Sequence, residues 1–366
     1  MGVALRGEVV VVGSGFAGAA TAYHLTRLGV RNVVLVEQED LPGRHASARN
    51  AAMARTTAVP PSIAPLAAEG LRFFAEPPAD LGCGPLLRSC GMLVLASGRQ
   101  AADLREALPR SWLAPDDVAR LVPVTSGGRF DGAVWGPRDG VVDIALLLAR
   151  LLAAARARGA RLLTGERAVA INIERGRVTG VVTGRGTIEA RWVVNAAGAW
   201  AGGVASLAHA APVPLRPCRR HLFATAALPW VKPTWPIVWD VTHGFYFRPE
   251  PPGLLLSPCD ETEHAPGLPS TDPAAAEELA TKLERFMPVV SGVEILASWA
   301  GLRTLGPDGC FVLGRDPEVD GFVWCAGLGG HGMTTCPSVG RIAAEAVLGR
   351  PAPAEHAAAR FAPTEA

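Results

Sequence analysis

Two short hydrophobic runs near the N-terminus frame a glycine-rich turn and a longer alanine-rich segment. Residues 9–12 are all valine, and residues 33–36 are a second run of valine and leucine, which is the length and composition of buried parallel strands. The segment between them has the composition of a helix and closes at Gly29. This pattern predicts a βαβ unit, with a glycine turn after the first strand.

Hydrophobic periodicity further along the chain predicts several more helices and strands. We expect one helix to start after Asp143 and end at Gly159, and another to run from Asp272–Pro273 to Met287–Pro288. A helix is also expected near the C-terminus, glycine-rich turns after Trp299, and a solvated loop at the charged residues 260–264. The expected strands are 161–163, 168–174, 178–183, 187–190, 192–195, 221–225, 245–248 and 253–257.

The glycine turn between the first two strands has the spacing of a dinucleotide site. Gly13 permits a tight turn, Gly15 lets a pyrophosphate approach the backbone, and Gly18 allows close packing of helix and strand. The helix N-terminus offers free N–H groups to phosphates. Glu37 ends the second strand, where a carboxylate can accept hydrogen bonds from ribose hydroxyls. The sequence therefore predicts a bound dinucleotide rather than an empty glycine turn.

Composition and charge exclude several other kinds of partner. The net charge is +1, from 35 basic and 34 acidic residues without a basic block, so neither nucleic acid nor an anionic membrane is expected. Prolines and glycines interrupt the uncharged segment 192–215, so no membrane span is expected. The seven scattered cysteines and the early first strand predict a cytoplasmic protein without a secretory leader or a metal site.

Glu37 with residues 47–50 resembles the acid and the Ser-x-Arg-Asn-like loop of the D-amino-acid oxidase superfamily of FAD-dependent oxidoreductases. The segments 193–200, 299–304 and 327–334 are similar to the same superfamily and follow its order. Within it, the chain is most similar to the D-arginine dehydrogenase and glycine–sarcosine oxidase type. The cues for this are the short segments 85–87, 218–220, 235–236, 245–249 and 254–258. The resemblance implies FAD, hydride transfer from Cα of an amino acid to flavin N5, and hydrolysis of the resulting imine to a 2-oxo acid.

The expected fold class is α/β, with a Rossmann-type FAD-binding domain and an inserted mixed, largely antiparallel α+β substrate domain. The FAD-binding domain is expected to comprise residues 1–76, 139–211 and 299–366, and the substrate domain residues 77–138 and 212–298. The residues expected to bind FAD are Gly13, Gly15, Phe16, Ala17, Gly18, Glu37, Gln38, Arg44, His45, Ser47, Arg49, Asn50, Ala51, Ala52, Val169, Ala197, Gly198, Trp200, Arg303, Gly329, Gly330, His331, Gly332, Met333 and Thr334.

An amino-acid substrate carries a carboxylate, and a buried carboxylate needs a cation beside it. Arginine matches a carboxylate with two parallel hydrogen bonds, so Arg303 and Arg220 are the candidates. From the residues alone Arg219 is as good a candidate as Arg220, and the resemblance favours Arg220. The other candidates are Tyr246 as a phenol donor, Gly330 as a carbonyl acceptor for the amine, and His331 as either a base or a pocket wall.

Several positions depart from the D-arginine type. Gly91 stands where that type has a glutamate that grips the substrate guanidinium, and Met53, Arg55 and Ala58 replace its His, Thr and Tyr. We therefore expect the preference for D-arginine to be lost. The expected substrate is a D-amino acid that is smaller, neutral or hydrophobic, or glycine or an N-methyl amino acid; Arg55 is an added cation that would suit an acidic side chain instead.

The monomeric sarcosine oxidases of this superfamily tether FAD through a cysteine just ahead of the position of Arg303. Gly301 stands at that place here, and Cys310 lies beyond the turn 306–309, so FAD is expected to be non-covalent. His45 is the remaining candidate for a tether.

Two other functions fit the residues less directly. The chain could be a flavoprotein subunit of a multi-component amine-oxidising complex. It could also be a flavin hydroxylase that uses NAD(P)H, although the sequence carries no second nucleotide glycine motif. For the favoured function the electron acceptor would be oxygen, a quinone or a dye.

Overall fold

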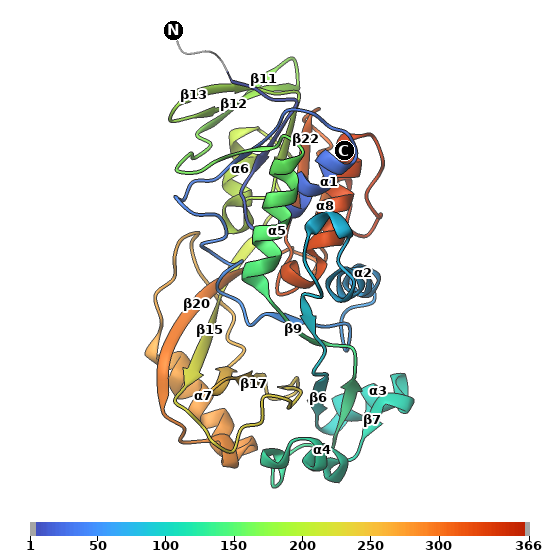
Figure 1. The fold of residues 1–366 in the computed structure, drawn as a ribbon, viewed down its shortest axis with the longest axis vertical. Coiled ribbons are helices and arrows are strands. Elements are labelled where there is room, and N and C mark those ends of the chain that lie inside the picture. The colour runs from blue at the N-terminus through green and yellow to red at the C-terminus, as the bar shows by residue number, and fades with distance from the viewer. Residues whose placement is uncertain (1–4, 363–366) are drawn as a thin grey trace.

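The computed structural model describes residues 5–362, and a parallel sheet lies at the centre of its upper half (Figure 1). All neighbouring strands of this six-stranded sheet run parallel except the pair at the β21 edge. In order across the sheet the strands are β10 (Arg161–Leu163), β3 (Val33–Val36), β2 (Val9–Val12), β14 (Trp192–Asn195), β22 (Phe322–Ala326) and β21 (Val312–Arg315).

Alternate side chains of the parallel strands enter two separate hydrophobic cores. Val9 and Val11 pack with helices on one face, whereas Val10 and Val12 pack on the other face. The first face is covered by α1 (Phe16–Arg27), α5 (Ile144–Ala157) and α8 (Gly332–Val347), with α2 (Ala64–Ala75) against α8. The second face is covered by α6 (Ala201–Leu207) and by a sheet of β1 (Leu5–Arg6), β13 (Gly186–Glu189), β12 (Arg177–Thr183) and β11 (Ala170–Glu174).

A large mixed sheet fills the lower half of the molecule (Figure 1). Its neighbouring strands are antiparallel except for the pair β16 and β6. In order they are β19 (Thr262–Glu263), β15 (Arg216–Thr225), β18 (Gly253–Ser257), β17 (Phe245–Glu250), β16 (Ile237–Asp240), β6 (Met92–Ala96), β8 (Gly132–Gly136) and β7 (Trp112–Leu113), with β20 (Ile295–Leu305) also paired to β15.

The two faces of the large sheet have different environments. One face packs against α7 (Pro273–Phe286) and α4 (Pro115–Leu121), and α3 (Gly98–Ala107) contacts β6 and β8. The other face packs against the loop around Ala51 and Met53, which comes from the glycine-turn half of the chain. A small sheet links the halves: β4 (Met53–Ala54), β9 (Gly140–Val142) and β5 (Leu87–Arg88). Single 3₁₀ turns occupy Ala79–Leu81, Pro109–Ser111, Pro123–Thr125, Gly198–Trp200, Pro288–Val290 and Ala358–Phe361.

The fold class expected from the sequence is confirmed, and local signals explain the helix ends. Asp143 Oδ1 accepts a hydrogen bond from Leu146 N–H at the start of α5, at 2.9 Å. Asp272 Oδ1 accepts one from Ala274 N–H at the start of α7, at 3.1 Å. Each carboxylate satisfies a backbone donor that the first helical turn leaves free. Across residues 5–362 every helix is too short or too polar to traverse a bilayer.

The glycine-rich turns expected after Trp299 begin later than expected, because β20 continues to Leu305; turns then follow around Gly309 and Gly329. Ala300 and Gly301 suggest a turn by composition, but the strand needs small residues there. A Cβ on Gly301 would lie 2.6 Å from the Arg49 carbonyl oxygen, so only glycine permits this approach of the two backbones. The expected domain boundary at residue 299 falls inside β20, and the division into two domains stays a prediction.

The contact between α2 and α8 generates a stability prediction in which the usual helix preference is reversed. Replacing a helix-interior glycine by alanine normally stabilises a helix by about 1 kcal/mol. A Cβ on Gly70 would lie 1.8 Å from the Thr334 carbonyl oxygen, so Gly70→Ala should lower the free energy of unfolding by about 1–3 kcal/mol. Gly202 in α6 has no heavy atom within 4 Å of the added Cβ and provides the matched control.

Urea unfolding followed by far-UV circular dichroism measures both variants. Gly202→Ala should be neutral or gain up to about 1 kcal/mol. A Gly70→Ala protein as stable as the unmodified chain would contradict the packing described for α2 and α8.

Candidate functional site

A cavity of about 510 Å³ lies at the carboxyl ends of the parallel strands. Its wall includes Gly13 after β2, Glu37 after β3, Ala196 after β14 and Gly327 after β22. The large sheet contributes residues of β15, β17 and β20 to the same wall. Ligands of parallel α/β sheets bind at this edge, because loops from several strands converge there.

The glycine turn is shaped so that side chains are excluded from it. A Cβ on Gly13 would lie 2.5 Å from the Ala196 carbonyl oxygen, and one on Gly15 would lie 2.8 Å from Ser47 Oγ. A Cβ on Gly18 would lie 1.9 Å from the Gly13 carbonyl oxygen. Gly13 and Gly15 line the cavity, whereas Gly18 is outside the lining and instead lets α1 pack against the turn. This narrow cradle of backbone fits a pyrophosphate.

Glu37 is oriented by the turn that precedes α1. Its Oε2 accepts hydrogen bonds from Ser14 N–H, at 2.9 Å, and from Ser14 Oγ–H, at 2.8 Å. Its Oε1 accepts one from Glu39 N–H, at 3.1 Å. The carboxylate lines the cavity and retains lone pairs for ribose hydroxyls. Sequence reasoning missed Ser14, although a hydroxyl residue between two glycines of the turn was a usable signal.

The loop 44–52 crosses the start of α1 and is held there by two polar side chains. Ser47 Oγ accepts a hydrogen bond from Phe16 N–H at 3.0 Å, which covers the first turn of the helix. Asn50 Oδ1 accepts one from Ala52 N–H, and its Nδ2 donates to the Ser47 carbonyl oxygen, both at 2.8 Å. Ala52 has φ of 56°, so the loop turns sharply at this point.

His45 and Arg44 share one carboxylate at the outer end of this loop. His45 Nε2 lies 2.8 Å from Glu39 Oε1, and Arg44 Nη1 lies 3.4 Å from Glu39 Oε2. The His45 ring lies 4.5 Å from the Trp200 ring, measured between centroids. Both loop residues line the cavity, with contacts that explain their positions without a covalent role.

Most of the remaining residues expected to bind FAD also line this cavity. Three expected residues are outside its lining: Gly18, His331 and Thr334. Thr334 is buried, and its hydroxyl donates to the Met53 carbonyl oxygen at 3.3 Å. His331 lines a neighbouring cavity. The expected residues in the lining are Phe16, Ala17, Gln38, Arg49, Ala51, Val169, Ala197, Gly198, Trp200, Arg303, Gly329, Gly330, Gly332 and Met333, besides those already described.

A second cavity of about 220 Å³ adjoins the first and shares part of its wall, including Arg220, Tyr246, Arg303 and Gly330. Strand register explains why the two arginines meet. Arg220 of β15 lies opposite Gly301 of β20, so Arg303, two residues further along, points to the same face of the sheet. The candidate catalytic residues are therefore brought together at the boundary of the two cavities.

Arg303 has no carboxylate within ion-pair distance anywhere in the described part of the chain. Its guanidinium lies over Gly330, where an added Cβ would be 3.0 Å from Arg303 Cζ and Nη1. Burial, reinforced by the charge of Arg220, lowers the pKa of Arg303. Arg303 is half-buried and its free N–H groups face the two cavities, so this position is suited to an anion that the protein does not supply.

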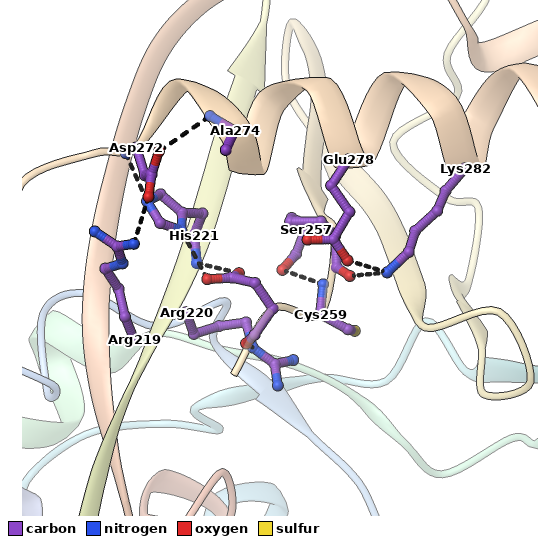
Figure 2. A network of polar contacts seen from close by, with 11 residues as sticks. Arg219, Arg220, His221, Ser257, Cys259, Asp272, Ala274, Glu278 and Lys282 are labelled. Atoms are coloured by element: carbon purple, nitrogen blue, oxygen red, sulfur yellow. Dashed lines mark hydrogen bonds and ion pairs between the residues drawn. The ribbon is translucent and has the colours of Figure 1, made fainter. Parts of the chain in front are cut away.

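Arg220 is held by a buried network that reaches the start of α7 (Figure 2). Its Nε donates to the Asp260 carbonyl oxygen at 2.6 Å. The Asp260 carboxylate accepts from His221 N–H at 2.8 Å and lies 2.7 Å from His221 Nδ1. His221 Nε2 accepts from Asp272 N–H at 2.9 Å, so Nδ1 carries the proton that Asp260 receives.

The expectation of a solvated loop at 260–264 is therefore wrong for Asp260, which is buried because His221 requires a partner. Glu261, next to it, lines the second cavity. Arg219 points away from Arg220 and pairs with Asp272 at 2.6 Å, so the geometry favours Arg220 over Arg219 for substrate contact (Figure 2).

Tyr246 and His331 differ in the protonation state that burial imposes. Burial raises the pKa of the Tyr246 phenol, which therefore remains a hydrogen-bond donor at neutral pH. Burial and the charges of Arg55 and Arg303 lower the pKa of His331 to about 3. An imidazole with that pKa is neutral and weakly basic at neutral pH, so a pocket wall suits His331 better than a base.

Arg55, which the sequence suggested as a cation for an acidic side chain, lines the second cavity together with Trp239. The Arg55 guanidinium carbon lies 4.3 Å from the centre of the Trp239 ring. The Trp239 side chain carries the cation–π contact that positions Arg55. No group of three or more potential metal ligands occurs in residues 5–362.

Comparison with known proteins identifies the family to which this fold belongs. The model of the DAO family, described as FAD dependent oxidoreductase, matches residues 8–346. The pyruvate dehydrogenase phosphatase regulatory subunit of Mus musculus is 28% identical over 93% of this chain and 41% of that protein. The sarcosine oxidase subunit beta of an Arthrobacter species is 26% identical over 91% of this chain and 85% of that subunit.

Among solved structures, glycine oxidase from Geobacillus kaustophilus superposes with a TM-score of 0.82 at 25% identity, covering 94% of this chain and 95% of that one. The chain spans about two fifths of the length of several curated relatives that it matches. The family model extends over nearly all of the parallel and mixed sheets. This chain therefore belongs to the DAO family of FAD-dependent oxidoreductases.

Proposed function

We propose that this protein oxidises an amino acid at Cα, giving an imine that water hydrolyses to a 2-oxo acid. The observation that carries the proposal is the position of Arg303, a half-buried guanidinium at the junction of two cavities, without a carboxylate partner in the described residues. FAD, when bound, supplies the acceptor for the hydride that leaves Cα. The substrates named by two similar proteins, glycine and sarcosine, carry a carboxylate that such a guanidinium would bind.

The larger cavity is the proposed position of FAD. The backbone at Gly13 and Gly15 would receive the pyrophosphate, and Glu37 would bind a ribose. The loop held by Ser47 and Asn50 would continue along the cofactor toward β20. We propose that Gly18 and Thr334 support this site from behind without touching the cofactor.

The smaller cavity is the proposed substrate pocket. Arg303, with Arg220, would bind the carboxylate, and Tyr246 would add a neutral donor. The Gly330 carbonyl oxygen would accept a hydrogen bond from the amine. The positive charges of the arginines disfavour an ammonium group nearby, so they favour the neutral amine whose Cα–H bond can be oxidised. Orientation by these groups supplies a large part of the catalysis.

Arginine itself is not the proposed substrate. At Gly91, φ is 81° and an added Cβ would lie 2.0 Å from the Trp135 ring. No carboxylate can therefore stand at the place where the D-arginine type has its glutamate. We propose a D-amino acid, glycine or an N-methyl amino acid, with oxygen, a quinone or a dye as electron acceptor.

The separation of the six-stranded sheet from the large mixed sheet supports the expected domains. We propose that residues 1–76, 139–211 and 299–366 form the FAD-binding domain and that 77–138 and 212–298 form the substrate domain, with β20 crossing the last boundary. We also propose a cytoplasmic location, because the cysteines are scattered and all are free in the described residues. The near-zero net charge supports the proposal that the protein has no nucleic-acid partner.

A second candidate function is a flavoprotein subunit of a multi-component amine-oxidising complex. The specific observation that favours it is the similarity to a protein named as one subunit of sarcosine oxidase, of which this chain spans 85%. Full turnover by the isolated chain with a dye acceptor would exclude a requirement for other subunits. Turnover only after addition of a partner would favour this second function.

Replacing Arg303 tests the proposed role of its guanidinium. In Arg303→Met the rate constant for anaerobic FAD reduction by a responsive amino acid should fall at least about 100-fold, because two charge-assisted hydrogen bonds are lost. Arg303→Lys should retain part of the rate. Arg156, exposed on α5, provides the control variant Arg156→Met.

Stopped-flow absorbance of the oxidised flavin band measures these rates, with the FAD content of each variant checked first. Undiminished reduction in Arg303→Met protein that retains FAD would contradict the proposed carboxylate site.

Non-covalent attachment of FAD stays a prediction and has a simple test. Acid precipitation of the holoprotein should leave the flavin in the supernatant, because Gly301 stands where a cysteine tether would be and backbone packing fills the space of its Cβ. Absorbance of pellet and supernatant measures the distribution. A yellow pellet that keeps its flavin after denaturation would show a covalent bond, and His45→Ala would then test the remaining tether.

A further inference from the structure

The substrate pocket carries more positive charge than one carboxylate can balance. Arg55, Arg220 and Arg303 all line it, and Glu261 is the one acidic residue in its described wall. Glu261 is exposed, so solvent weakens its effect on the buried cations. The pocket therefore has a surplus of cationic groups facing a common space.

Arg55 is held toward this space by contacts that leave its charge unpaired. Its Nη1 donates to the carbonyl oxygens of Thr57, at 3.4 Å, and Ala58, at 3.1 Å. Its guanidinium stacks on the Trp239 ring at 4.3 Å. Burial, with the charge of Arg303 as the next cause, lowers the pKa of Arg55 to about 10, so it remains a cation at neutral pH.

Asp139 is the acid nearest in charge effect to Arg55, but its oxygens accept hydrogen bonds from other groups. Asp139 Oδ1 accepts from Thr56 N–H at 2.7 Å and from Thr56 Oγ–H at 2.9 Å. Its Oδ2 accepts from Thr57 N–H at 3.1 Å. Asp139 thus shapes the loop that presents Arg55, and no ion pair joins the two side chains in residues 5–362.

A substrate with a second anionic group would balance this pocket. An amino acid with a neutral amine carries one negative charge, which Arg303 and Arg220 would receive under the proposed function. A further carboxylate would match the planar fork of Arg55 with two charge-assisted hydrogen bonds. With a monocarboxylate substrate that half-buried fork would be left without an anionic partner, which would cost binding energy relative to a dicarboxylate.

We propose that the substrate is a dicarboxylic amine, with its second carboxylate bound by Arg55. This inference rests on the proposed function and narrows it to the acidic alternative that Arg55 left open in the sequence, in place of a neutral or hydrophobic substrate. Arg55 determines specificity here, and the chemistry at Cα is unchanged.

The test compares matched pairs of substrates that differ in the second carboxylate, using the FAD-loaded protein. The pairs are glutamate and glutamine, aspartate and asparagine, each in both enantiomers, and iminodiacetate and sarcosine. Anaerobic reduction of the flavin gives kcat/KM without a choice of electron acceptor. In at least one pair the diacid should exceed its partner at least about 10-fold, the effect of one charge-assisted hydrogen bond.

Variants of Arg55 assign this preference to its charge. In Arg55→Gln the ratio of kcat/KM between diacid and partner should fall toward one, mainly through a higher KM for the diacid. Arg55→Lys should retain part of the ratio, and the exposed control Arg156→Gln should retain all of it. The flavin spectrum of each variant checks that the site is intact.

The results that would overturn this inference differ from those that would overturn the proposed function. Reduction by monocarboxylate amines at least as fast as by every diacid, or an unchanged ratio in Arg55→Gln, would overturn this inference and leave the proposed function standing. Protein that binds FAD but is reduced by no amine would overturn the proposed function, and the inference with it.

Discussion

The uncompensated charge of Arg303 is the feature on which the functional account depends. The side chain comes from the C-terminal part of the long strand β20, next to β15, and it lines both cavities without a carboxylate partner in residues 5–362. Its guanidinium lies against Gly330, where a Cβ would be 3.0 Å from Arg303 Cζ, so only glycine leaves this space to the arginine. A protein that keeps a cation in such a place loses stability unless an anion is bound there.

One loop contacts both the wall of the cofactor cavity and the strand that carries Arg303. Residues 44–54 leave the second parallel strand, and Ser47 covers the start of α1 within this loop. Further along, the Arg49 backbone touches Gly301 on β20, and Arg248 Nε donates to the Ala51 carbonyl oxygen at 2.8 Å. The same short segment therefore contacts the glycine turn, β20 and β17, so it sets the distance between the two cavities. Small changes in this loop are expected to affect cofactor and substrate together.

The sequence predicted the βαβ unit and most helix ends because those features depend on local periodicity and capping, as with Asp143 and Asp272. It also identified Arg220, Tyr246 and Arg303, although their convergence depends on strand register and could not be derived locally. The course of β20 was missed because Ala300 and Gly301 have turn-like composition, and only the distant Arg49 backbone explains them. The burial of Asp260 was missed for a similar reason, since its partner His221 is far away in sequence.

The most direct measurement is a crystal structure of the protein with FAD and a carboxylate that cannot be oxidised, such as methoxyacetate. The account predicts the isoalloxazine ring in the larger cavity and a carboxylate oxygen within about 3 Å of the Arg303 guanidinium, at hydrogen-bond distance. A flavin bound away from the Gly13–Gly15 turn, or a carboxylate that leaves Arg303 without a partner, would contradict it.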